Sequence, residues 1–214
     1  MTTEAPGPGS RPYHHGDLFD ALAKVAEELV RETGIHGFSL RECARRAGVA
    51  HSAPGHHFGD VTGLLTEVAA RGFERLTARM QAHRAGADGP EALERIARCY
   101  VDFALSDPVV FVLMFHSDRV NRGSPRVQRA GDAAFGELVS AVASAKRDSP
   151  RDNEVLRFAW AAIHGIAMLL VDGPLMPAGG DRRGGSGALA ESTIRRIVYA
   201  VTSFVEPAGD GNLA

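Results

Sequence analysis

The sequence predicts an all-α protein with about nine helices. Apolar residues recur at helical spacing through most of the 214 residues. No segment shows the strict alternation of apolar and polar residues that is typical of a half-buried strand. Hydrophobic residues make up 44% of the chain and charged residues 23%, which are ordinary values for a folded soluble protein. The chain is long enough for one large domain or two small ones.

The first predicted helix spans residues 17–33. Leu18, Leu22 and Leu29 fall on one helical face, and Gly34 is a typical residue at a helix end. This amphipathic face predicts a helix that covers a core with one side.

Two short helices follow. Ser39 and Glu42 form a capping-box pattern, in which the Ser39 hydroxyl bonds to the Glu42 amide and the Glu42 carboxylate returns to the Ser39 amide. Gly48 ends this helix, and a third helix is expected to begin near His51. Pro54 is tolerated there because it lies in the first turn.

The remaining helices are longer. They are expected over residues 61–85, 91–106, 109–115, 126–146, 151–171 and 188–205. Residues 172–187 are rich in glycine and are expected to be a flexible linker. The apolar stretch from Ala159 to Val171 is shorter than the roughly 18 residues of a membrane span. We therefore expect a buried helix there and no membrane association.

Several protein classes are disfavoured by composition. Cys43 and Cys99 lie far apart, which argues against a disulfide framework or a zinc site, and both are expected to be small core residues. The N-terminal residues lack the apolar core of a signal peptide, so a cytoplasmic protein is expected. The net charge of −2 does not indicate a nucleic-acid-binding protein, and such a function must rest on local residues.

The short helices carry the most specific pattern. A small residue, Ala44, stands where two crossing helices approach, and Gly48 occupies the tight turn, as in a helix-turn-helix. This segment resembles the TetR family of bacterial repressors. The resemblance covers 13–17, the helix-turn-helix, 55–60, and a Trp-Ala-Ala-Ile-His-Gly stretch at 160–165 that is similar to the Trp-His-Gly signature of one subgroup. A helical corner without DNA binding is the alternative interpretation.

The resemblance implies a homodimer that reads a palindromic DNA operator and is released by a small-molecule effector, with no cofactor and no metal. The expected domains are an N-terminal arm (1–12), a DNA-binding domain (13–60), a ligand-binding and dimerisation domain (61–206) and a tail (207–214). Repression is the usual function in this family, and the sequence does not exclude activation.

The DNA-contacting residues follow from the resemblance. Ser39 is expected to cap its helix and face a phosphate, and Arg41 to add a contact to the DNA backbone. The remaining expected contacts are Ala50, His51 and Ser52 at the start of the third helix and Gly55, His56 and His57 toward its end. The adjacent histidines could also indicate metal, but neighbours on a helix point about 100° apart, which favours a structural or phosphate-facing role.

Two departures from the family pattern predict weak DNA binding. Gly55 replaces a common tyrosine and Val61 a common lysine, both of which bind the DNA backbone in the family. Residues 1–65 hold six basic and eight acidic side chains, and phosphate attraction dominates nonspecific affinity. Six of the nine histidines also lie there. We therefore hypothesise that DNA affinity rises as the pH falls from about 8 to 6, where imidazole titrates.

An effector pocket and a dimer interface are expected in the C-terminal half. The candidate pocket residues are Phe103, Phe111, Met114, Phe115, Trp160, His164 and Met168, which could equally form a core. His164 is either a hydrogen-bonded core residue or, with His116, a polar contact to an apolar or aromatic ligand. The candidate interface residues are Leu156, Ile194, Ile197, Val198, Val201 and Phe204, and on this hypothesis Val198→Asp gives monomers.

Three functions therefore compete. The first is a ligand-responsive repressor, and the second is a small-molecule-binding protein on the same scaffold with weakened DNA binding. The third is an enzyme, for which no catalytic constellation is recognisable in the sequence. Nonspecific DNA affinity and its salt dependence discriminate the first two functions.

Overall fold

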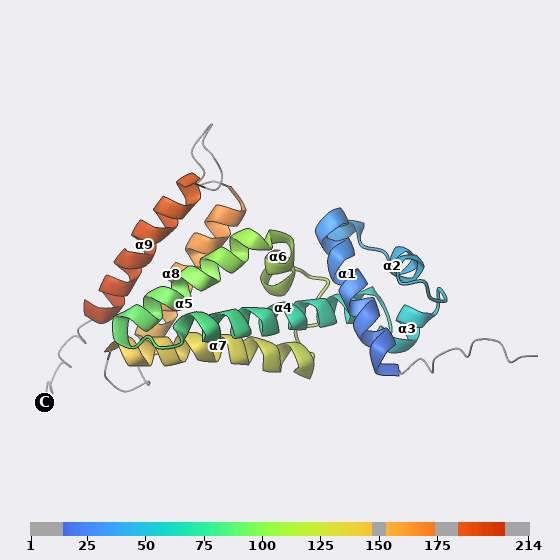
Figure 1. Cartoon of the computed structure of the whole chain (residues 1–214), viewed down its shortest axis with the longest axis horizontal. Helices are drawn as coiled ribbons and strands as arrows, with labels where there is room; N and C mark the ends of the chain where they lie inside the picture. The colour runs from blue at the N-terminus through green and yellow to red at the C-terminus, as the bar shows by residue number, and fades with distance from the viewer. Residues whose placement is uncertain (1–14, 147–152, 174–183, 204–214) are drawn as a thin grey trace, which may run out of the picture.

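The computed structural model describes residues 15–146, 153–173 and 184–203. Within these ranges the chain forms nine helices and no strand, which confirms the predicted all-α class. The helices are α1 (His15–Gly37), α2 (Leu40–Arg46), α3 (Ala53–Phe58), α4 (Val61–Arg84), α5 (Gly89–Ser106), α6 (Pro108–His116), α7 (Pro125–Lys146), α8 (Asn153–Val171) and α9 (Gly184–Ser203). Figure 1 shows α1 to α3 at one end, α5, α8 and α9 at the other, and α4 running between them.

The N-terminal helix α1 has a break where its end was predicted. Gly34 leaves the helical region, with φ 74° and ψ 170°, a conformation that suits a residue without a Cβ atom. Helical hydrogen bonding resumes for a few residues and ends at Gly37. Leu22 and Leu29 are buried, as the amphipathic pattern predicted.

The predicted capping box of α2 is wrong. Ser39 does occupy the N-cap position, but its side chain makes no capping hydrogen bond. The Glu42 carboxylate instead accepts hydrogen bonds from Arg45 (Nη2, 2.7 Å) and Arg46 (Nε, 2.9 Å). Charge-assisted bonds to two guanidinium groups are stronger than one bond to a neutral amide, so the carboxylate turns along the helix.

A tight corner joins α3 to α4. Helix α3 begins at Ala53, two residues later than predicted, with Pro54 in its first turn. At the start of α4, Asp60 caps the helix by accepting a hydrogen bond from the Gly63 amide at 2.8 Å. A Cβ atom on Gly63 would lie 1.8 Å from the carbonyl oxygen of Phe58. Only glycine therefore fits the corner without movement of the backbone.

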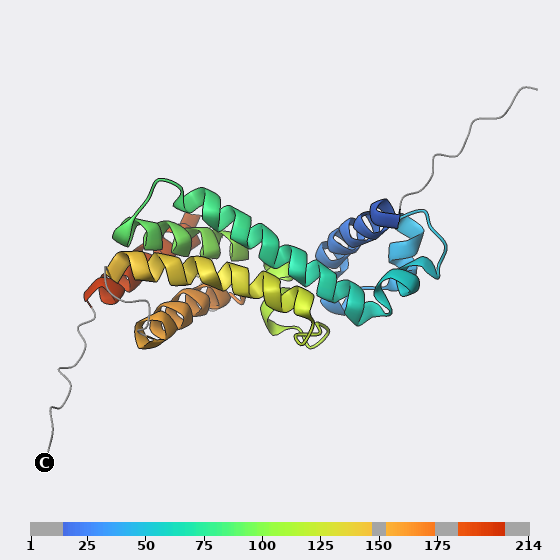
Figure 2. The same cartoon turned by 90° about the horizontal axis from the view of Figure 1, so that it is seen from below.

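Helix α4 belongs to both halves of the molecule. It packs against α1 and α3 at its N-terminal end and against α5, α6 and α7 further along, and Figure 2 shows it beside α7 over much of its length. Gly72 allows α6 to approach closely, since a Cβ atom there would lie 2.6 Å from the sulfur of Met114. The predicted domain boundary after residue 60 coincides with the start of this helix.

The C-terminal helices differ from expectation in two ways. Residues 184–187, expected in the linker, form the first turn of α9. The segment Glu154–Val171 of α8 is long and apolar enough to cross a membrane by length and composition alone, so the short apolar stretch did not exclude such a helix. One face of this helix buries Ala159, Ile163 and Ala167 in the protein core, and 33% of the segment is buried.

The corner glycine gives a stability test. We expect Gly63→Ala to lower the free energy of unfolding by about 1–3 kcal/mol, because the new methyl group overlaps the Phe58 carbonyl. Gly136→Ala is the matched control, since a Cβ atom on that helical glycine meets nothing within 4 Å and alanine favours a helix by up to about 1 kcal/mol. Thermal unfolding followed by circular dichroism measures both. A Gly63→Ala protein as stable as the Gly136→Ala protein would contradict the corner constraint.

Candidate DNA-binding surface and effector cavity

The predicted DNA-contacting residues lie on α2, on α3 and in the segments next to these helices. The exposed members are Ser39, Arg41, Ala50, His51, Ser52 and His56, and the half-buried ones are Gly55 and His57. A hollow of about 490 Å³ brings together Ser39, Arg41 and His51, which come from the two ends of the α2 segment. Its lining also includes Glu42 and Arg45, so basic and acidic side chains both border it. Ala50, His51 and Ser52 precede α3 rather than forming its first turn, because the helix begins at Ala53.

The positive charge of this surface is partly neutralised. Arg45 binds Glu42, and Arg46 bridges Glu42 and Glu32. Hydrogen bonds from Arg45 and then Arg46 hold the pKa of Glu42 at about 2, so this carboxylate stays ionised. Among the basic side chains described in α2, Arg41 is the one with no such ion pair. Arg41 is therefore the described basic side chain of α2 that stays available for the predicted phosphate contact.

The two adjacent histidines of α3 have different surroundings. The His57 ring lies edge-on to Phe19 of α1, with ring centroids 6.4 Å apart, and Phe58 stacks on the same Phe19 at 4.4 Å. His57 thus helps to hold α3 against α1, whereas His56 is exposed. The described residues contain no group of three side chains placed to hold a metal ion.

An apolar cavity of about 400 Å³ lies among the helices of the C-terminal half. Its lining comes from α4, α5, α6, α7, α8 and the loop between α6 and α7. The lining residues are Phe73, Leu76, Met80, Ile96, Tyr100, Phe115, Arg122, Gly131, Ala134, Phe135, Leu138, Trp160 and Ile163. Phe115 and Trp160 were among the predicted pocket residues, and Arg122 is the one charged residue in the lining.

The other predicted pocket residues do not line this cavity. Phe103, Phe111 and Met114 are at most 1% exposed and belong to the core. Met114 is held there because it lies over Gly72, where α6 and α4 approach most closely. Met168 is half-buried outside the cavity lining. Sequence periodicity identified the apolar faces of these helices but not which members of a face border an empty volume.

A chain of hydrogen bonds lies behind one wall of the cavity. The Tyr100 hydroxyl lies 2.7 Å from His164 Nδ1, and His164 Nε2 lies 3.3 Å from His116 Nε2. The Trp160 ring stacks on His164 with centroids 5.2 Å apart. Thus His164 is a hydrogen-bonded residue outside the lining that reaches the cavity through Tyr100 and Trp160.

Burial fixes the proton positions in this chain. Burial raises the pKa of Tyr100, so the phenol stays protonated and its hydroxyl group donates a hydrogen bond to His164. Burial, and then the neighbouring His116, lower the pKa of His164, so its imidazole is neutral at pH 7. The consistent assignment has Tyr100 donating to Nδ1 and His164 donating through Nε2 to His116.

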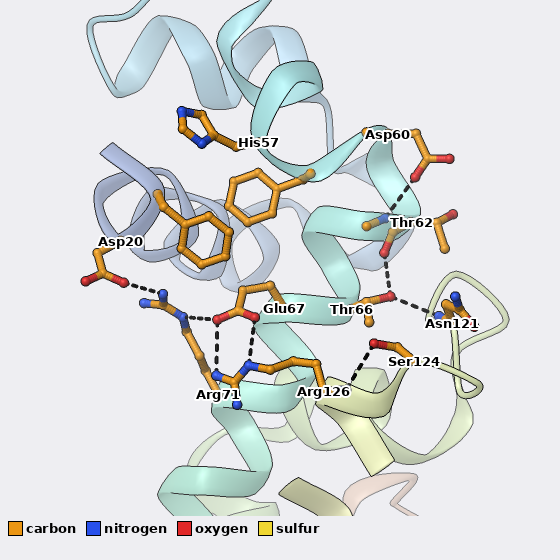
Figure 3. A pocket seen from close by; sticks show the side chains of 14 residues that line it. Asp20, His57, Asp60, Thr62, Thr66, Glu67, Arg71, Asn121, Ser124 and Arg126 are labelled. Carbon is orange, nitrogen blue, oxygen red and sulfur yellow. Dashed lines mark hydrogen bonds and ion pairs between the residues drawn. The ribbon is translucent and has the colours of Figure 1, made fainter. Parts of the chain in front are cut away.

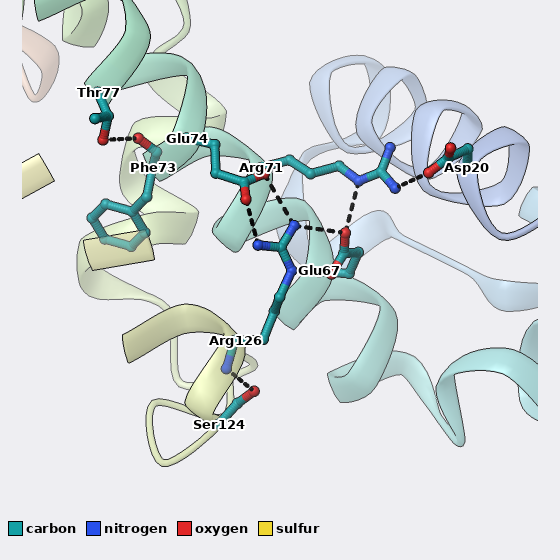
Figure 4. A network of polar contacts seen from close by, with 8 residues as sticks. All are labelled: Asp20, Glu67, Arg71, Phe73, Glu74, Thr77, Ser124 and Arg126. Atoms are coloured by element: carbon teal, nitrogen blue, oxygen red, sulfur yellow. Dashed lines mark hydrogen bonds and ion pairs between the residues drawn. The ribbon is translucent and has the colours of Figure 1, made fainter. Parts of the chain in front are cut away.

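A polar cleft of about 760 Å³ separates the two halves of the molecule (Figure 3). At its base the Glu67 carboxylate of α4, only 8% exposed, binds two guanidinium groups. Arg71 Nε donates to it at 2.8 Å and Arg126 Nε of α7 at 3.1 Å. Arg71 also binds Asp20 of α1 at 2.6 Å, and Arg126 binds Glu74 of α4 at 3.0 Å (Figure 4). This network joins α1, α4 and α7.

The loop between α6 and α7 adds contacts to both halves. Arg119 donates to the carbonyl oxygen of Ile35, at the end of α1, and the Asn121 amide donates to Thr66 Oγ1 of α4 at 2.9 Å. One residue later, Arg122 lines the cavity. The loop therefore connects the cavity to α1 and α4, which pack against α2 and α3. The irregular loop sequence gave no periodic signal from which this role could be predicted.

The predicted dimer-interface residues are largely internal. Ile194, Ile197, Val198 and Val201 are between 0% and 8% exposed within a single chain, because this face of α9 packs on α5 and α8. Leu156 is half-buried, and Phe204 lies outside the described residues. These four α9 side chains are therefore core residues, and Val198→Asp would place a charge in the chain's own core. The exposed apolar side chains of α8 and α9 are Phe158, Leu169 and Tyr199.

Comparison with known proteins covers both halves of the chain. A family model described as the C-terminal domain of Tetracyclin repressor-like proteins matches residues 93–197. The HTH-type transcriptional regulator BetI of Burkholderia thailandensis is 32% identical over 105 residues, which are 48% of this chain and 52% of BetI. The chain spans little more than half the length of the curated relatives that it matches, 57% in the other case.

Solved structures match over more of the length. A protein of unknown function from Rhodococcus sp. RHA1 is 33% identical, with a TM-score of 0.70 over 87% of this chain and 98% of that chain. The TetR family regulator PfmR of Thermus thermophilus, at 19% identity, shares the fold, with a TM-score of 0.61 over 83% of this chain and 97% of that chain. The Trp-His-Gly subgroup stays a prediction, since none of these matches distinguishes it. The helix-turn-helix pattern, the matched C-terminal domain and the shared fold agree, and the chain belongs to the TetR family of regulators.

Proposed function

We propose that this protein is a cytoplasmic, ligand-responsive transcriptional repressor. It binds a palindromic operator as a homodimer and is released by a small apolar or aromatic molecule. The observation that carries this proposal is the position of α4, which contributes Phe73, Leu76 and Met80 to the cavity and packs on α1 and α3 at its other end. A molecule that enters the cavity therefore acts on a helix that supports the candidate DNA-binding surface.

The proposed mechanism is a shift between two states. Two recognition helices of a dimer must lie about 34–36 Å apart to enter successive major grooves of DNA. The network around Glu67 fixes α1 and α7 to α4 in the present arrangement. A ligand that binds better to an arrangement with another spacing shifts the population away from the DNA-binding state.

The second candidate function is small-molecule binding with weakened DNA binding. Gly55 lacks a side chain that could reach a phosphate, and Arg45 and Arg46 are bound to carboxylates. The enzymatic alternative is disfavoured, because the family consists of regulators.

Selection of random double-stranded DNA on the purified protein tests the first function. We expect a palindrome to be enriched and its affinity to fall with salt, because phosphate neutralisation releases counterions. The selection is carried out at pH 6.5 and at pH 7.5, which both lie within about one unit of the ordinary imidazole pKa. If no sequence is enriched at either pH, the second function is favoured.

Restoring the two phosphate-binding side chains of the family should strengthen DNA binding. A Cβ atom on Gly55 meets nothing within 4 Å, so the first side-chain atom of Gly55→Tyr causes no clash, and Val61→Lys adds a charge at the start of α4. We expect the double variant to bind nonspecific DNA about tenfold more tightly, with a salt slope steeper by about one. Fluorescence anisotropy with a random duplex measures both quantities. Ser140→Lys, exposed toward the far end of α7, is the charge-matched control, and an equal gain in that control would count against a specific backbone contact.

The exposed histidines should make DNA binding dependent on pH. We expect nonspecific affinity to rise as the pH falls from about 8 to 6, as the histidine content of the DNA-binding segment predicts. A double variant, His51→Gln with His56→Gln, should lose most of this rise. Equal affinities of the unmodified protein at both pH values would remove the hypothesis.

A further inference from the structure

We propose that the effector is an apolar molecule with one carboxylate, and that Arg122 binds this carboxylate. This inference rests on the proposed function of the cavity as an effector site. It adds the chemical class of the effector and the residue that selects it.

The charge of the cavity lining is the first argument. Of the thirteen lining residues, twelve are uncharged and one, Arg122, is a permanent cation. No acidic residue is part of the lining. A bound anion would therefore meet one attractive charge and no repulsive charge within the cavity wall.

The partners of Arg122 are the second argument. Its guanidinium donates to two neutral acceptors, the carbonyl oxygens of Met114 at 3.0 Å and Ser117 at 3.4 Å. By contrast, Arg31, Arg71 and Arg126 each bind two carboxylates. Among the described residues no carboxylate pairs with Arg122. Arg122 is exposed at the edge of the cavity, so its guanidinium is accessible, and a ligand carboxylate can pair with it through two parallel hydrogen bonds.

The Tyr100 hydroxyl does not compete for this role. Its proton is directed to His164 Nδ1 at 2.7 Å, which leaves only oxygen lone pairs toward the cavity. Lone pairs repel a carboxylate. The acid group therefore lies at the Arg122 side, and the apolar body packs against the Trp160 ring. A cavity of about 400 Å³ lies near the lower end of the range for small-molecule sites, which fits a monocarboxylate with one or two rings.

This assignment also connects the ligand to the domain junction. Arg122 holds the end of α6 through the Met114 carbonyl, and its neighbour Asn121 holds Thr66 of α4. A carboxylate that draws the guanidinium away from Met114 and Ser117 pulls on the same loop through which Arg119 contacts α1. The bound acid thus acts on the contacts that orient the DNA-binding half.

Trp160 allows a direct test, because it is the one tryptophan of the chain and lines the cavity. Phenylbutanoate and its neutral analogue phenylbutanamide are titrated against the full-length protein, with tryptophan emission as the readout. We expect the acid to bind about tenfold more tightly than the amide, the difference that one charge-assisted pair supplies. Arg122→Gln should remove this preference for the acid over the amide, and Arg122→Lys should retain part of it.

Arg129→Gln is the matched control, an exposed arginine of α7 outside the cavity lining, and it should keep the full preference. Equal affinities for acid and amide in the unmodified protein, or no binding of the acid, would overturn the assignment. An acid preference that persists in Arg122→Gln would also overturn it, as would its loss in Arg129→Gln. No DNA is present in this titration, so it tests the acid preference independently of the proposed function. Failure to find an operator would contradict the function as a regulator, and the acid preference could still be measured.

Discussion

The buried carboxylate of Glu67 is the interaction on which the arrangement of the two halves depends. An ionised carboxylate in the interior is costly unless charge and hydrogen bonds compensate it. Here Arg71 and Arg126 supply both, from two different helices, and Arg71 extends the network to Asp20 of α1. Because the carboxylate needs both guanidinium groups, α7 and α1 have one preferred position against α4.

The chain uses two kinds of polar network for different purposes. The network at the junction is ionic and borders a polar cleft, where its outer pair between Arg71 and the exposed Asp20 can exchange protein contacts for water contacts at low cost. In the second network Tyr100 and His164 are neutral at pH 7 and lie behind an apolar wall, and His116 at its outer end is exposed. This network orients the Trp160 side of the cavity without placing a charge there. Arg122 is therefore the one charged residue in the cavity lining.

Local sequence patterns predicted the helices. The hydrogen-bond partners and the cavity-lining residues depend on contacts between helices, which local patterns do not predict. Helical periodicity is a property of a single segment, so the order and approximate bounds of the helices were predictable. Whether the Glu42 carboxylate binds the Ser39 amide or Arg45 and Arg46 depends on which of these donors forms the stronger hydrogen bonds. Likewise, Phe111 and Phe115 share an apolar segment, but only the second lines the cavity. The outward face of α9 was not predictable because Ile194 and Tyr199 are both apolar enough to be buried.

The continuity of α4 has a consequence for exchanging parts between related proteins. A chimera joined after residue 60 would combine the α1 of one parent with the Arg71, Glu67 and Gly63 of another. The donor helix would then meet a foreign corner and a foreign ion-pair network. A workable exchange takes the first half of α4 together with α1 to α3, and it matches residue 126 of α7 to the new helix. The segment that must be exchanged as one unit is thus larger than the helix-turn-helix alone.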